Sequence, residues 1–340
     1  MLELTNRSVI LAKRPLGYPT QDDFQIVKSE IPEIRDGEIL IRTIWMSLDP
    51  YMRGRVRETA ITGVGPVPHP IGATMPGGTV GKVVSSRNSK IPIGTYVDSQ
   101  AGWQDYLISN GRGLRQIDPK TAPLSTALGI LGMPGLTAYH GLFEIGRPQV
   151  GETLVVSAAS GAVGAVVGQL GKLAGCKVVG IAGTNEKVNY VTNELGFDAG
   201  INYRTDDIGK ALAKHCPEGV DIYFDNVGGT ISDIVIDGIA DRGKVIVCGQ
   251  ISQYNLPDQE SGPRNLWQFL RKQATIEGFN VGRYADRAEI ARKRLTQLVQ
   301  QGMLKYKEDV IDGLENAPAA FIGLMKGENF GKLLVRVSED

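Results

Sequence analysis

Cysteine and histidine are scarce in this chain, and that scarcity limits its metal chemistry. The 340 residues include three cysteines and three histidines. No cysteine precedes Cys176, and His69 and His140 are the only histidines before it. A catalytic zinc ion takes three protein ligands and a structural zinc ion takes four, mostly thiolates and imidazoles. We therefore expect no metal site and no zinc chemistry.

The chain also lacks an excess of charge of one sign and a long apolar run. Lys and Arg number 37, as do Asp and Glu, so the formal net charge is zero. A nucleic-acid binder held by counterion release needs a basic surface, and a membrane span needs about 20 apolar residues. The N-terminal stretch has an apolar run of only four residues, too short for a signal peptide or an anchor. With no CxxC motif and an odd number of thiols, we expect a cytoplasmic protein that binds neither nucleic acid nor membrane.

The sequence pattern divides the chain into two parts, and glycine is in excess throughout, at 43 residues. Residues 1 to about 120 hold short β-branched or aromatic runs between turn residues, a pattern typical of a small barrel-like β domain. From residue 151 short strands alternate with helices, which predicts βαβ units and a doubly wound parallel sheet. We expect a β domain over 1–124, rejoined by 305–340, and an α/β domain over 125–304.

The expected elements follow from these patterns. The run 332–337 has no βαβ partner, so we assign it to the β domain. The expected strands are 8–12, 24–29, 38–47, 79–85, 104–108, 154–158, 177–182, 200–203, 220–226, 243–248 and 332–337. The expected helices are 125–145 with a break near 133–135, 162–174, 186–195, 208–215, 231–240, 288–301 and 315–326.

A glycine-rich turn joins the first strand and helix of the α/β domain. Residues 159–164 read A-x-G-x-x-G. Gly161 lets the backbone approach a pyrophosphate, and Gly164 lets the helix pack against the strand. The N–H groups at the helix N-terminus then bind the phosphates, and glycines at 164, 168, 171 and 175 give the helix a small-residue face. Alone the turn would also fit a plain tight turn, but within βαβ units it predicts a Rossmann dinucleotide site.

The next strand carries no acid where NAD enzymes usually place one. Residues 179–185, at its end, include no acid, and the small or polar residues among them make room. Lys187 follows and could pair with a 2′-phosphate, as could Arg204 or the hydroxyl of Tyr203, although Lys187 could equally be a solvated surface residue. The missing acid predicts NADP rather than NAD as the cofactor.

Several stretches together resemble one known family. They are 47–55, 132–139, 159–168, 224–229, 248–255 and 314–332. They resemble the zinc-independent medium-chain reductases that reduce the C=C bond of enones and enals: leukotriene B4 dehydrogenase/prostaglandin reductases, 2-alkenal reductases and NADPH-dependent curcumin reductases. SLDPYMRGR, GWQDY and GETLVVSAA are most similar to the bacterial curcumin-reductase branch. The segments 57–74 and 258–263 follow no pattern of the family, and we expect both to border the substrate.

The resemblance implies a GroES-like catalytic domain, a Rossmann NADP-binding domain and roles for particular residues. Tyr254 is similar to the family's catalytic tyrosine, and Tyr51 to a tyrosine that lines the substrate. A homodimer through the cofactor domains is implied, for which 241–248 and 274–281 could supply an edge strand. The residues implied to bind NADPH are Gly161, Ala162, Val163, Gly164, Lys187, Tyr203, Asn226, Cys248, Gly249, Ile251, Ser252, Tyr254, Phe279, Asn280, Val281 and Asn329.

The chemistry of such a reductase depends on hydrogen-bond donors. Without a metal, the charge that builds on the substrate's carbonyl oxygen must be held by a tyrosine hydroxyl, a backbone N–H or the ribose 2′-OH of the cofactor. We predict an NADPH-dependent ene reductase that transfers hydride to the β-carbon of an enone or enal, such as a curcumin-like or 15-oxo-prostaglandin-like compound. Tyr254 and Tyr51 could instead only hold their loops. The alternatives are an NADPH quinone reductase of the same superfamily and a non-catalytic NADPH-binding protein.

Overall fold

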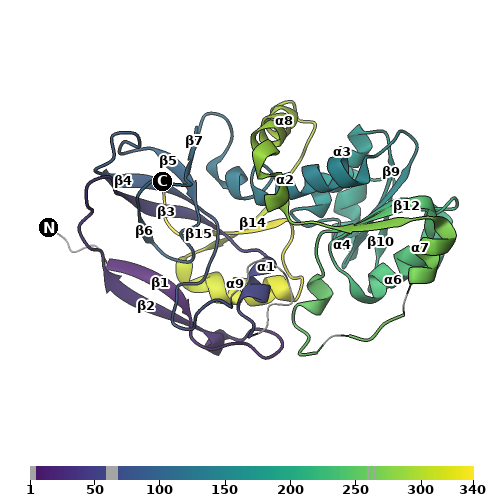
Figure 1. Ribbon diagram of the computed structural model, residues 1–340, viewed down its shortest axis with the longest axis horizontal. Coiled ribbons are helices and arrows are strands. Elements are labelled where there is room, and N and C mark those ends of the chain that lie inside the picture. Colours follow the sequence, from purple (N-terminus) through teal and green to yellow (C-terminus); the bar gives the residue numbers. More distant parts are fainter. Residues whose placement is uncertain (1–4, 59–67, 259, 264) are drawn as a thin grey trace. The chain divides into compact units, whose positions relative to one another are not determined.

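The chain folds as two units (Figure 1). The computed structural model describes residues 5–58, 68–258, 260–263 and 265–340. The first unit comprises Met1–Gly129, Glu308–Asn329 and Leu333–Asp340, and the second unit comprises Ile130–Lys307 and Phe330–Lys332. The chain therefore passes from one unit to the other more than once.

The first unit is built on antiparallel strands. β1 (Thr5–Leu11) pairs with β2 (Phe24–Glu30) in a sheet of their own. The described residues also form a seven-stranded sheet in the order β14-β15-β3-β4-β5-β7, with β6 paired to β3. β15 runs antiparallel to β3, so the last strand returns to the first unit as the sequence predicted. The bounds are β3 (Ile39–Ser47), β4 (Thr79–Ser86), β5 (Tyr96–Ser99), β6 (Tyr106–Ser109), β7 (Arg115–Ile117), β14 (Glu308–Asp312) and β15 (Lys332–Arg336).

Three short strands and one short helix of the first unit were not predicted from the sequence. β5, β7 and β14 contain four, three and five residues, too few to show an alternating pattern. The five-residue helix α1 (Tyr51–Arg55) was not predicted either, whereas the expected helix 315–326 forms as η7 (Leu314–Asn316) and α9 (Ala317–Met325). The core of this unit includes Trp103, whose ring stacks on Phe24 at 5.7 Å and meets Phe321 edge-on at 5.6 Å.

The second unit is built on a parallel sheet. Its strands lie in the order β10-β9-β8-β11-β12-β13, and every pairing in the described sheet is parallel. This is the strand order of a doubly wound dinucleotide-binding fold, with a switch point between the first and fourth strands, which confirms the predicted fold class. The bounds are β8 (Thr153–Ser157), β9 (Lys177–Ala182), β10 (Ala199–Asn202), β11 (Val220–Asp225), β12 (Ile239–Val247) and β13 (Thr275–Gly278).

Helices cover both faces of the parallel sheet. In Figure 1, α2, α3 and α8 lie above the sheet and α6 lies below it, and α5 packs against α6. All five residues of β8 are buried, as expected of a strand covered on both faces. The helices are α2 (Met133–His140), α3 (Gly164–Leu173), α4 (Asn185–Asn189), α5 (Ile208–His215), α6 (Gly229–Asp237), α7 (Leu266–Lys272) and α8 (Ala288–Gln300).

The boundaries in the second unit differ from the predicted ones for local reasons. The expected helix 125–145 is interrupted between η2 (Leu124–Leu128) and α2, just before the predicted break, and Pro134 lies in the first turn of α2, where its missing N–H is not needed. The expected helix 186–195 divides into α4 and the π turn η4 (Tyr190–Glu194). α7 was not predicted, and β13 within the expected segment 274–281 is an edge strand. The other segment expected to supply an edge, 241–248, is a wrong prediction, because most of it lies in β12, which pairs with β11 on one side and β13 on the other.

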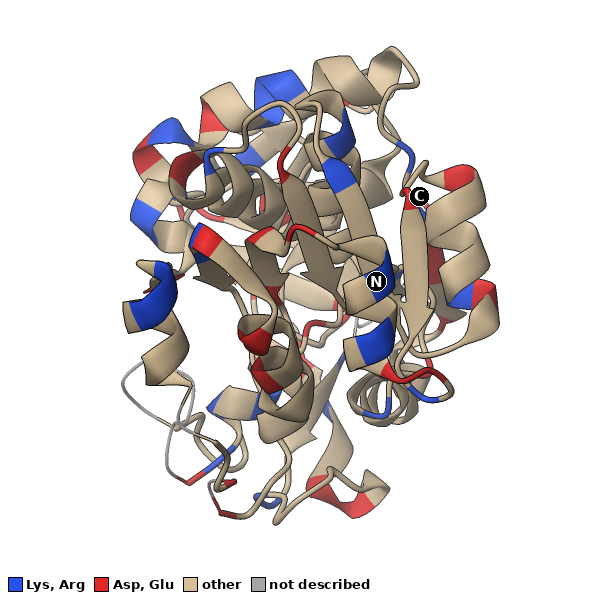
Figure 2. Cartoon of the chain, turned by 90° about the vertical axis from the view of Figure 1, so that its right-hand side faces the viewer, with Lys and Arg blue, Asp and Glu red and all other residues tan. Residues whose placement is uncertain are grey.

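Charge is mixed over the molecule. Lys and Arg lie among Asp and Glu on the elements drawn in Figure 2. Among the described residues, no helix is long and apolar enough to cross a membrane. The expected substrate segments 57–74 and 258–263 fall partly outside the described residues, at 59–67 and 259.

Candidate functional site

The glycine-rich turn between β8 and α3 leaves its backbone open. Ala158 has a φ of 50°, a left-handed conformation at the end of β8. A Cβ placed on Gly161 would meet only the carbonyl oxygen of Ala158, at 3.2 Å, so no other atom outside the neighbouring residues crowds that position. A Cβ on Gly164 would collide with the backbone of Ala158 and Ala159, which confirms that Gly164 permits close packing of helix and strand.

The start of α3 presents unused donors. In the described part of the chain, the N–H groups of Ala162, Val163 and Gly164 bond to no acceptor. Such groups at a helix N-terminus, together with the helix dipole, form an anion site. The donors and the open backbone at Gly161 therefore fit a pyrophosphate.

The predicted small-residue face of this helix is correct for three of its four glycines. A Cβ on Gly168 would enter the ring of Phe197, and one on Gly171 would collide with Leu154. Gly175 is different, because it lies beyond the helix with a φ of 86°. Gly175 therefore ends the helix in a left-handed conformation and does not belong to the packed face.

The ends of β9 and β10 bring the predicted 2′-phosphate residues to neighbouring positions. Tyr203 donates its N–H to the carbonyl of Ala182 at 3.1 Å, and a Cβ on Gly183 would lie 3.0 Å from the Tyr203 hydroxyl. Lys187 lies in the first turns of α4, where its N–H donates to the Thr184 cap at 3.2 Å. The guanidinium of Arg204 lies 5.8 Å from the Tyr203 ring centroid.

Asp225, at the end of β11, is the centre of a hydrogen-bond network that the sequence analysis missed. Its side chain is buried, at 2% exposure, and no described residue forms an ion pair with it. An ionised carboxylate only accepts hydrogen bonds, so donors alone can satisfy it. An acid at the last position of a buried strand was the available signal. The donors are the Tyr223 hydroxyl at 2.9 Å, the Ser157 hydroxyl at 3.2 Å, the N–H groups of Val227 and Gly228 at 2.9 and 3.0 Å, the Ser232 hydroxyl at 2.6 Å and the Gln250 amide at 3.1 Å.

Asn226 links the ends of β8 and β11. Its side-chain amide donates to the Ser157 carbonyl at 2.8 Å, and its N–H donates to the Ser157 hydroxyl at 2.9 Å. Asn226 therefore lies beside the strand end from which the glycine-rich turn begins.

The loop after β12 is fastened to the turn after β11. The N–H groups of Cys248 and Gly249 donate to the Asp225 carbonyl at 2.9 and 3.1 Å. Further along, the N–H of Ile251 donates to the Asn226 carbonyl at 3.4 Å, and that of Ser252 donates to the Val227 carbonyl at 3.0 Å. Four backbone hydrogen bonds thus fix the loop at the carboxyl edge of the sheet.

Tyr254 lies buried at the end of this loop, with 8% of its surface exposed. Its hydroxyl oxygen accepts the N–H of Gln250 at 3.2 Å. Burial raises the pKa of Tyr254, so the hydroxyl keeps its proton at neutral pH. Burial also raises the pKa of Cys248, to about 12, which makes this thiol a poor nucleophile.

The segment after β13 reaches the same edge of the sheet. Phe279 donates its N–H to the Val247 carbonyl at 3.3 Å, and its ring meets Phe224 edge-on at 6.4 Å. The side chain of Asn280 accepts the N–H of Gly282 at 2.9 Å, and Val281 lies between these two residues. The predicted residues of the second unit therefore all lie near the carboxyl ends of the parallel strands, where α/β folds bind ligands.

Two predicted residues lie in the first unit. Tyr51 begins α1, and burial, together with the nearby Asp49 carboxylate, raises the pKa of its hydroxyl. Asn329 follows α9, directly before Phe330, whose ring meets Tyr190 edge-on in the second unit.

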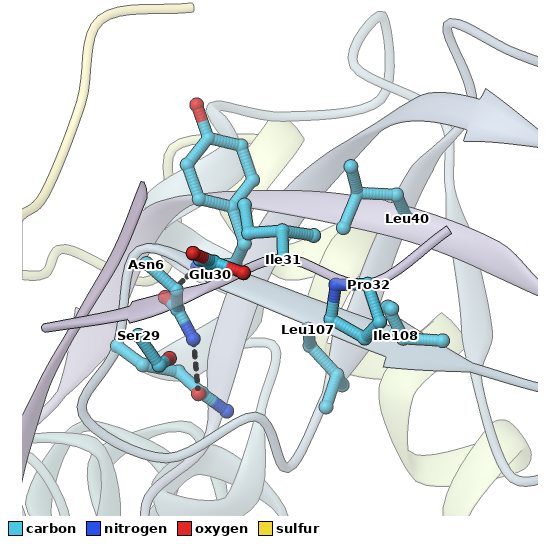
Figure 3. A pocket seen from close by; sticks show the side chains of 10 residues that line it. Asn6, Ser29, Glu30, Ile31, Pro32, Leu40, Leu107 and Ile108 are labelled. Carbon is cyan, nitrogen blue, oxygen red and sulfur yellow. Dashed lines mark hydrogen bonds between the residues drawn. The ribbon is translucent and has the colours of Figure 1, made fainter. Parts of the chain in front are cut away.

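The first unit also holds a cavity of about 240 Å³ (Figure 3). Ile31, Pro32, Leu107 and Ile108 form its apolar side. On its polar side the Asn6 amide donates to the Gln104 side chain at 3.0 Å. No predicted site residue lines this cavity.

Two family models match most of the chain. "N-terminal domain of oxidoreductase" matches residues 7–117, and "Zinc-binding dehydrogenase" matches residues 162–299. The described residues do not fit a zinc ion, because they contain no group of three or more His, Cys, Asp or Glu that could hold a metal ion.

Named relatives align over nearly the full length. NADPH-dependent curcumin reductase of Escherichia coli is 44% identical, and the alignment covers 98% of both chains. Prostaglandin reductase 1 of Bos taurus is 43% identical, over 97% of this chain and 98% of the relative. The crystal structure of CurA in complex with NADPH from Vibrio vulnificus is 43% identical and superposes with a TM-score of 0.93, over 98% of this chain and 100% of that chain. These identities confirm the resemblance read from the sequence: the chain belongs to the medium-chain NADP-dependent oxidoreductases that include curcumin reductase and prostaglandin reductase 1.

Proposed function

We propose that this protein is an NADPH-dependent reductase of the C=C bond of α,β-unsaturated ketones and aldehydes. The observation that carries the proposal is the placement of Tyr254. Its protonated, buried hydroxyl lies on a loop fixed to the carboxyl edge of the sheet, the edge that also carries the turn that fits a pyrophosphate. Relatives named for reducing curcumin, prostaglandins and 2-alkenals support this substrate class.

The residues of the second unit fit the cofactor. The open backbone at Gly161 and the N–H groups of Ala162, Val163 and Gly164 receive the pyrophosphate. Lys187 and Tyr203, with Arg204 beside it, receive the 2′-phosphate. The nicotinamide end is lined by Asn226, by the segment 279–281 and by Cys248, Gly249, Ile251, Ser252 and Tyr254 of the loop after β12, and the resemblance to the family implies a further contact from Asn329.

When bound, NADPH supplies the hydride that a C=C reduction needs. The Tyr254 hydroxyl donates a hydrogen bond to the carbonyl oxygen of the substrate, on which negative charge builds as the β-carbon accepts the hydride. A proton taken up at the α-carbon then completes the saturated product. Because burial keeps the Tyr254 hydroxyl protonated, it remains a donor throughout the physiological pH range. Tyr51, the second tyrosine of the proposed catalytic site, lines and positions the substrate.

A substrate panel tests the function and separates it from the alternatives. The purified protein is mixed with NADPH and, in turn, an enal, an enone, a dienone such as curcumin and a simple quinone, and the loss of absorbance at 340 nm is followed. We expect turnover of the enones and enals, with a saturated carbonyl compound as product. Turnover of quinones alone would identify a quinone reductase, and tight NADPH binding without any turnover would identify a non-catalytic binding protein.

We also propose that the protein forms a homodimer through the edge strand β13. All four residues of β13 are exposed, and it lies at the edge of the parallel sheet. The neighbouring helix α7 exposes Leu266, Trp267 and Leu270 at 65–71%. An edge strand beside an exposed apolar helix is suited to pairing with a second copy.

Light scattering tests this assembly. The chain has a mass of 36.7 kDa, and we expect twice that mass at micromolar concentration. Ile276→Lys should produce monomers, whereas Val150→Lys, which also alters an exposed apolar residue of the second unit, should not. A wild-type mass near 36.7 kDa would contradict the dimer.

A further inference from the structure

Gln250 contacts both the buried carboxylate and the proposed catalytic hydroxyl. Its side-chain amide donates to Asp225 Oδ2 at 3.1 Å. Its backbone N–H donates to the Tyr254 hydroxyl oxygen at 3.2 Å. One residue therefore connects the hydrogen-bond network at the end of β11 with the loop residue that is proposed to hold the substrate oxygen.

The Asp225 end of this connection is rigid. Asp225 receives its other donors from β8, β11, the following turn and α6, through Ser157, Tyr223 and Ser232 among others. Hydrogen bonds to a buried charge are among the stronger ones in proteins, so the carboxylate is a fixed anchor. The Gln250 amide is the side-chain donor that this network receives from the loop 248–254.

The Gln250 side chain also packs closely against the turn after β11. Gly228 has a φ of 74°, and a Cβ placed there would collide with the Gln250 amide. The left-handed φ favours glycine at position 228, and the Gln250 amide lies directly against its backbone. This close approach confines the amide of Gln250 between the Gly228 backbone and the Asp225 carboxylate.

At the other end of the connection, the hydrogen bond from the Gln250 N–H determines where the hydroxyl proton of Tyr254 points. The oxygen accepts the Gln250 N–H with one of its lone pairs, so the O–H bond must point away from that nitrogen. If the backbone at Gln250 shifts, this hydrogen bond and the direction of the O–H bond shift with it. Such small displacements of a reacting group can lower a rate by up to about 100-fold.

We propose that Gln250 is a positioning residue: its amide, fastened to Asp225, holds its own backbone N–H where it orients the Tyr254 hydroxyl. This inference rests on the proposed function of Tyr254. Gln250 does not touch the substrate, and it acts only through the hydroxyl that it orients.

The first test compares two glutamines of the same loop. Gln250→Met removes the amide and keeps the side-chain length. Gln253→Met is the matched control, because the Gln253 amide donates to Ser252 at 3.0 Å and to Glu260 at 2.8 Å, and neither bond involves Asp225 or the Tyr254 hydroxyl. We expect Gln250→Met to lower kcat with an enone about 10-fold, with the enone KM and the NADPH Kd, measured by fluorescence, within about threefold of wild type. Gln253→Met should stay within about twofold in all three constants. Equal kcat values for the two variants would overturn the proposal.

A double-mutant cycle shows whether Gln250 acts through the hydroxyl. In the Tyr254→Phe background, Gln250→Met should change kcat by less than about twofold, because no hydroxyl is left to orient. A further 10-fold fall in that background would overturn the proposal, since Gln250 would then act by another route. If Tyr254→Phe leaves kcat unchanged, the proposed role of Tyr254 fails and this inference fails with it. If Tyr254→Phe lowers kcat and Gln250→Met does not, the inference fails alone.

Gln250→Glu gives a second readout, which also serves if the methionine variant does not fold. Two carboxyl groups about 3 Å apart raise the pKa of one of them. At low pH the introduced carboxyl group is protonated and donates to Asp225 in place of the amide, and at higher pH the two carboxylates repel. Tyr223, Cys248 and Tyr254 face this pair, and all have a raised pKa, so they stay neutral. We expect kcat of the variant, relative to wild type, to fall as pH rises from about 5 to about 8. A ratio independent of pH would overturn the proposal.

Discussion

The two units differ in how they assemble their candidate functional residues. In the second unit, parallel strands end at one edge, so Ser157, Asp225 and Gln250 meet in one hydrogen-bond network although they are far apart in the sequence. In the first unit, Tyr51 lies on a five-residue helix, and Asn329 lies in the segment that follows another helix. The edge of the parallel sheet thus holds the proposed contacts to the cofactor and the substrate oxygen in one preorganised hydrogen-bond network, while the residues implied in the first unit lie on a short helix and on a segment after a helix.

The largest effect is expected on stability, when a buried carboxylate of the second unit is removed and compared with a buried carboxylate of the first unit. Asp225→Ala should lower the free energy of unfolding by about 3 kcal/mol or more, because six donors lose their acceptor. Asp23→Ala should lower it by about 1 kcal/mol, because this carboxylate accepts the N–H and hydroxyl of Thr20 as a local cap. Urea unfolding measures both values. Equal losses would show that the network at the sheet edge is not the stronger anchor.

A smaller effect is expected at the 2′-phosphate position. Lys187→Ala should raise the Kd of NADPH about 10- to 150-fold, which corresponds to the loss of a charged hydrogen bond of about 1.5–3 kcal/mol. The Kd of NADH should hardly change, because NADH has no 2′-phosphate. Lys210→Ala removes a far more exposed lysine of the same unit and should change neither constant. Wild-type NADPH affinity in the Lys187 variant would make Lys187 an ordinary surface residue.

The pH dependence of the rate should be flat where the proposed donor stays protonated. Burial raises the pKa of Tyr254 above its usual value near 10, so ionisation does not remove the donor between about pH 7 and pH 9.5. The same shift favours the folded state below about pH 10, and this stabilisation is lost as the pH rises through the folded-state pKa. We expect kcat to vary less than about twofold over that range. A fall of kcat centred near pH 8 would contradict a protonated Tyr254 as the donor.

No effect is expected from metal chelation. The described residues contain no cluster of three or more potential ligands, although one matching family model is named for zinc binding. Dialysis against a strong chelator should leave kcat unchanged, and added zinc should not raise it. Activity that is lost on chelation and restored by zinc would refute the hydrogen-bond mechanism.

The sequence predicted the second unit more completely than the first, for physical reasons. Strands such as β8 and β9 are continuous apolar runs because they are buried on both faces, so their bounds could be read closely. β5 and β7 are defined by pairing with partners distant in the sequence, which local patterns do not reveal. The glycine-rich turn could be predicted because its glycine pattern reflects a local need, the close approach of helix and strand that Gly164 permits. The roles of Asp225 and Gln250 could not, because their hydrogen bonds arise only when the strand ends meet.

The most direct test of the account is the kcat of Tyr254→Phe, measured beside Tyr51→Phe with several enones. Removing a donor that acts mainly as charge builds should lower kcat and kcat/KM together, by about 10- to 100-fold, with the NADPH Kd within about threefold of wild type. Tyr51→Phe should mainly raise KM. A kcat for Tyr254→Phe within twofold of wild type would remove Tyr254 from the mechanism and contradict the claim that the second unit holds the substrate oxygen.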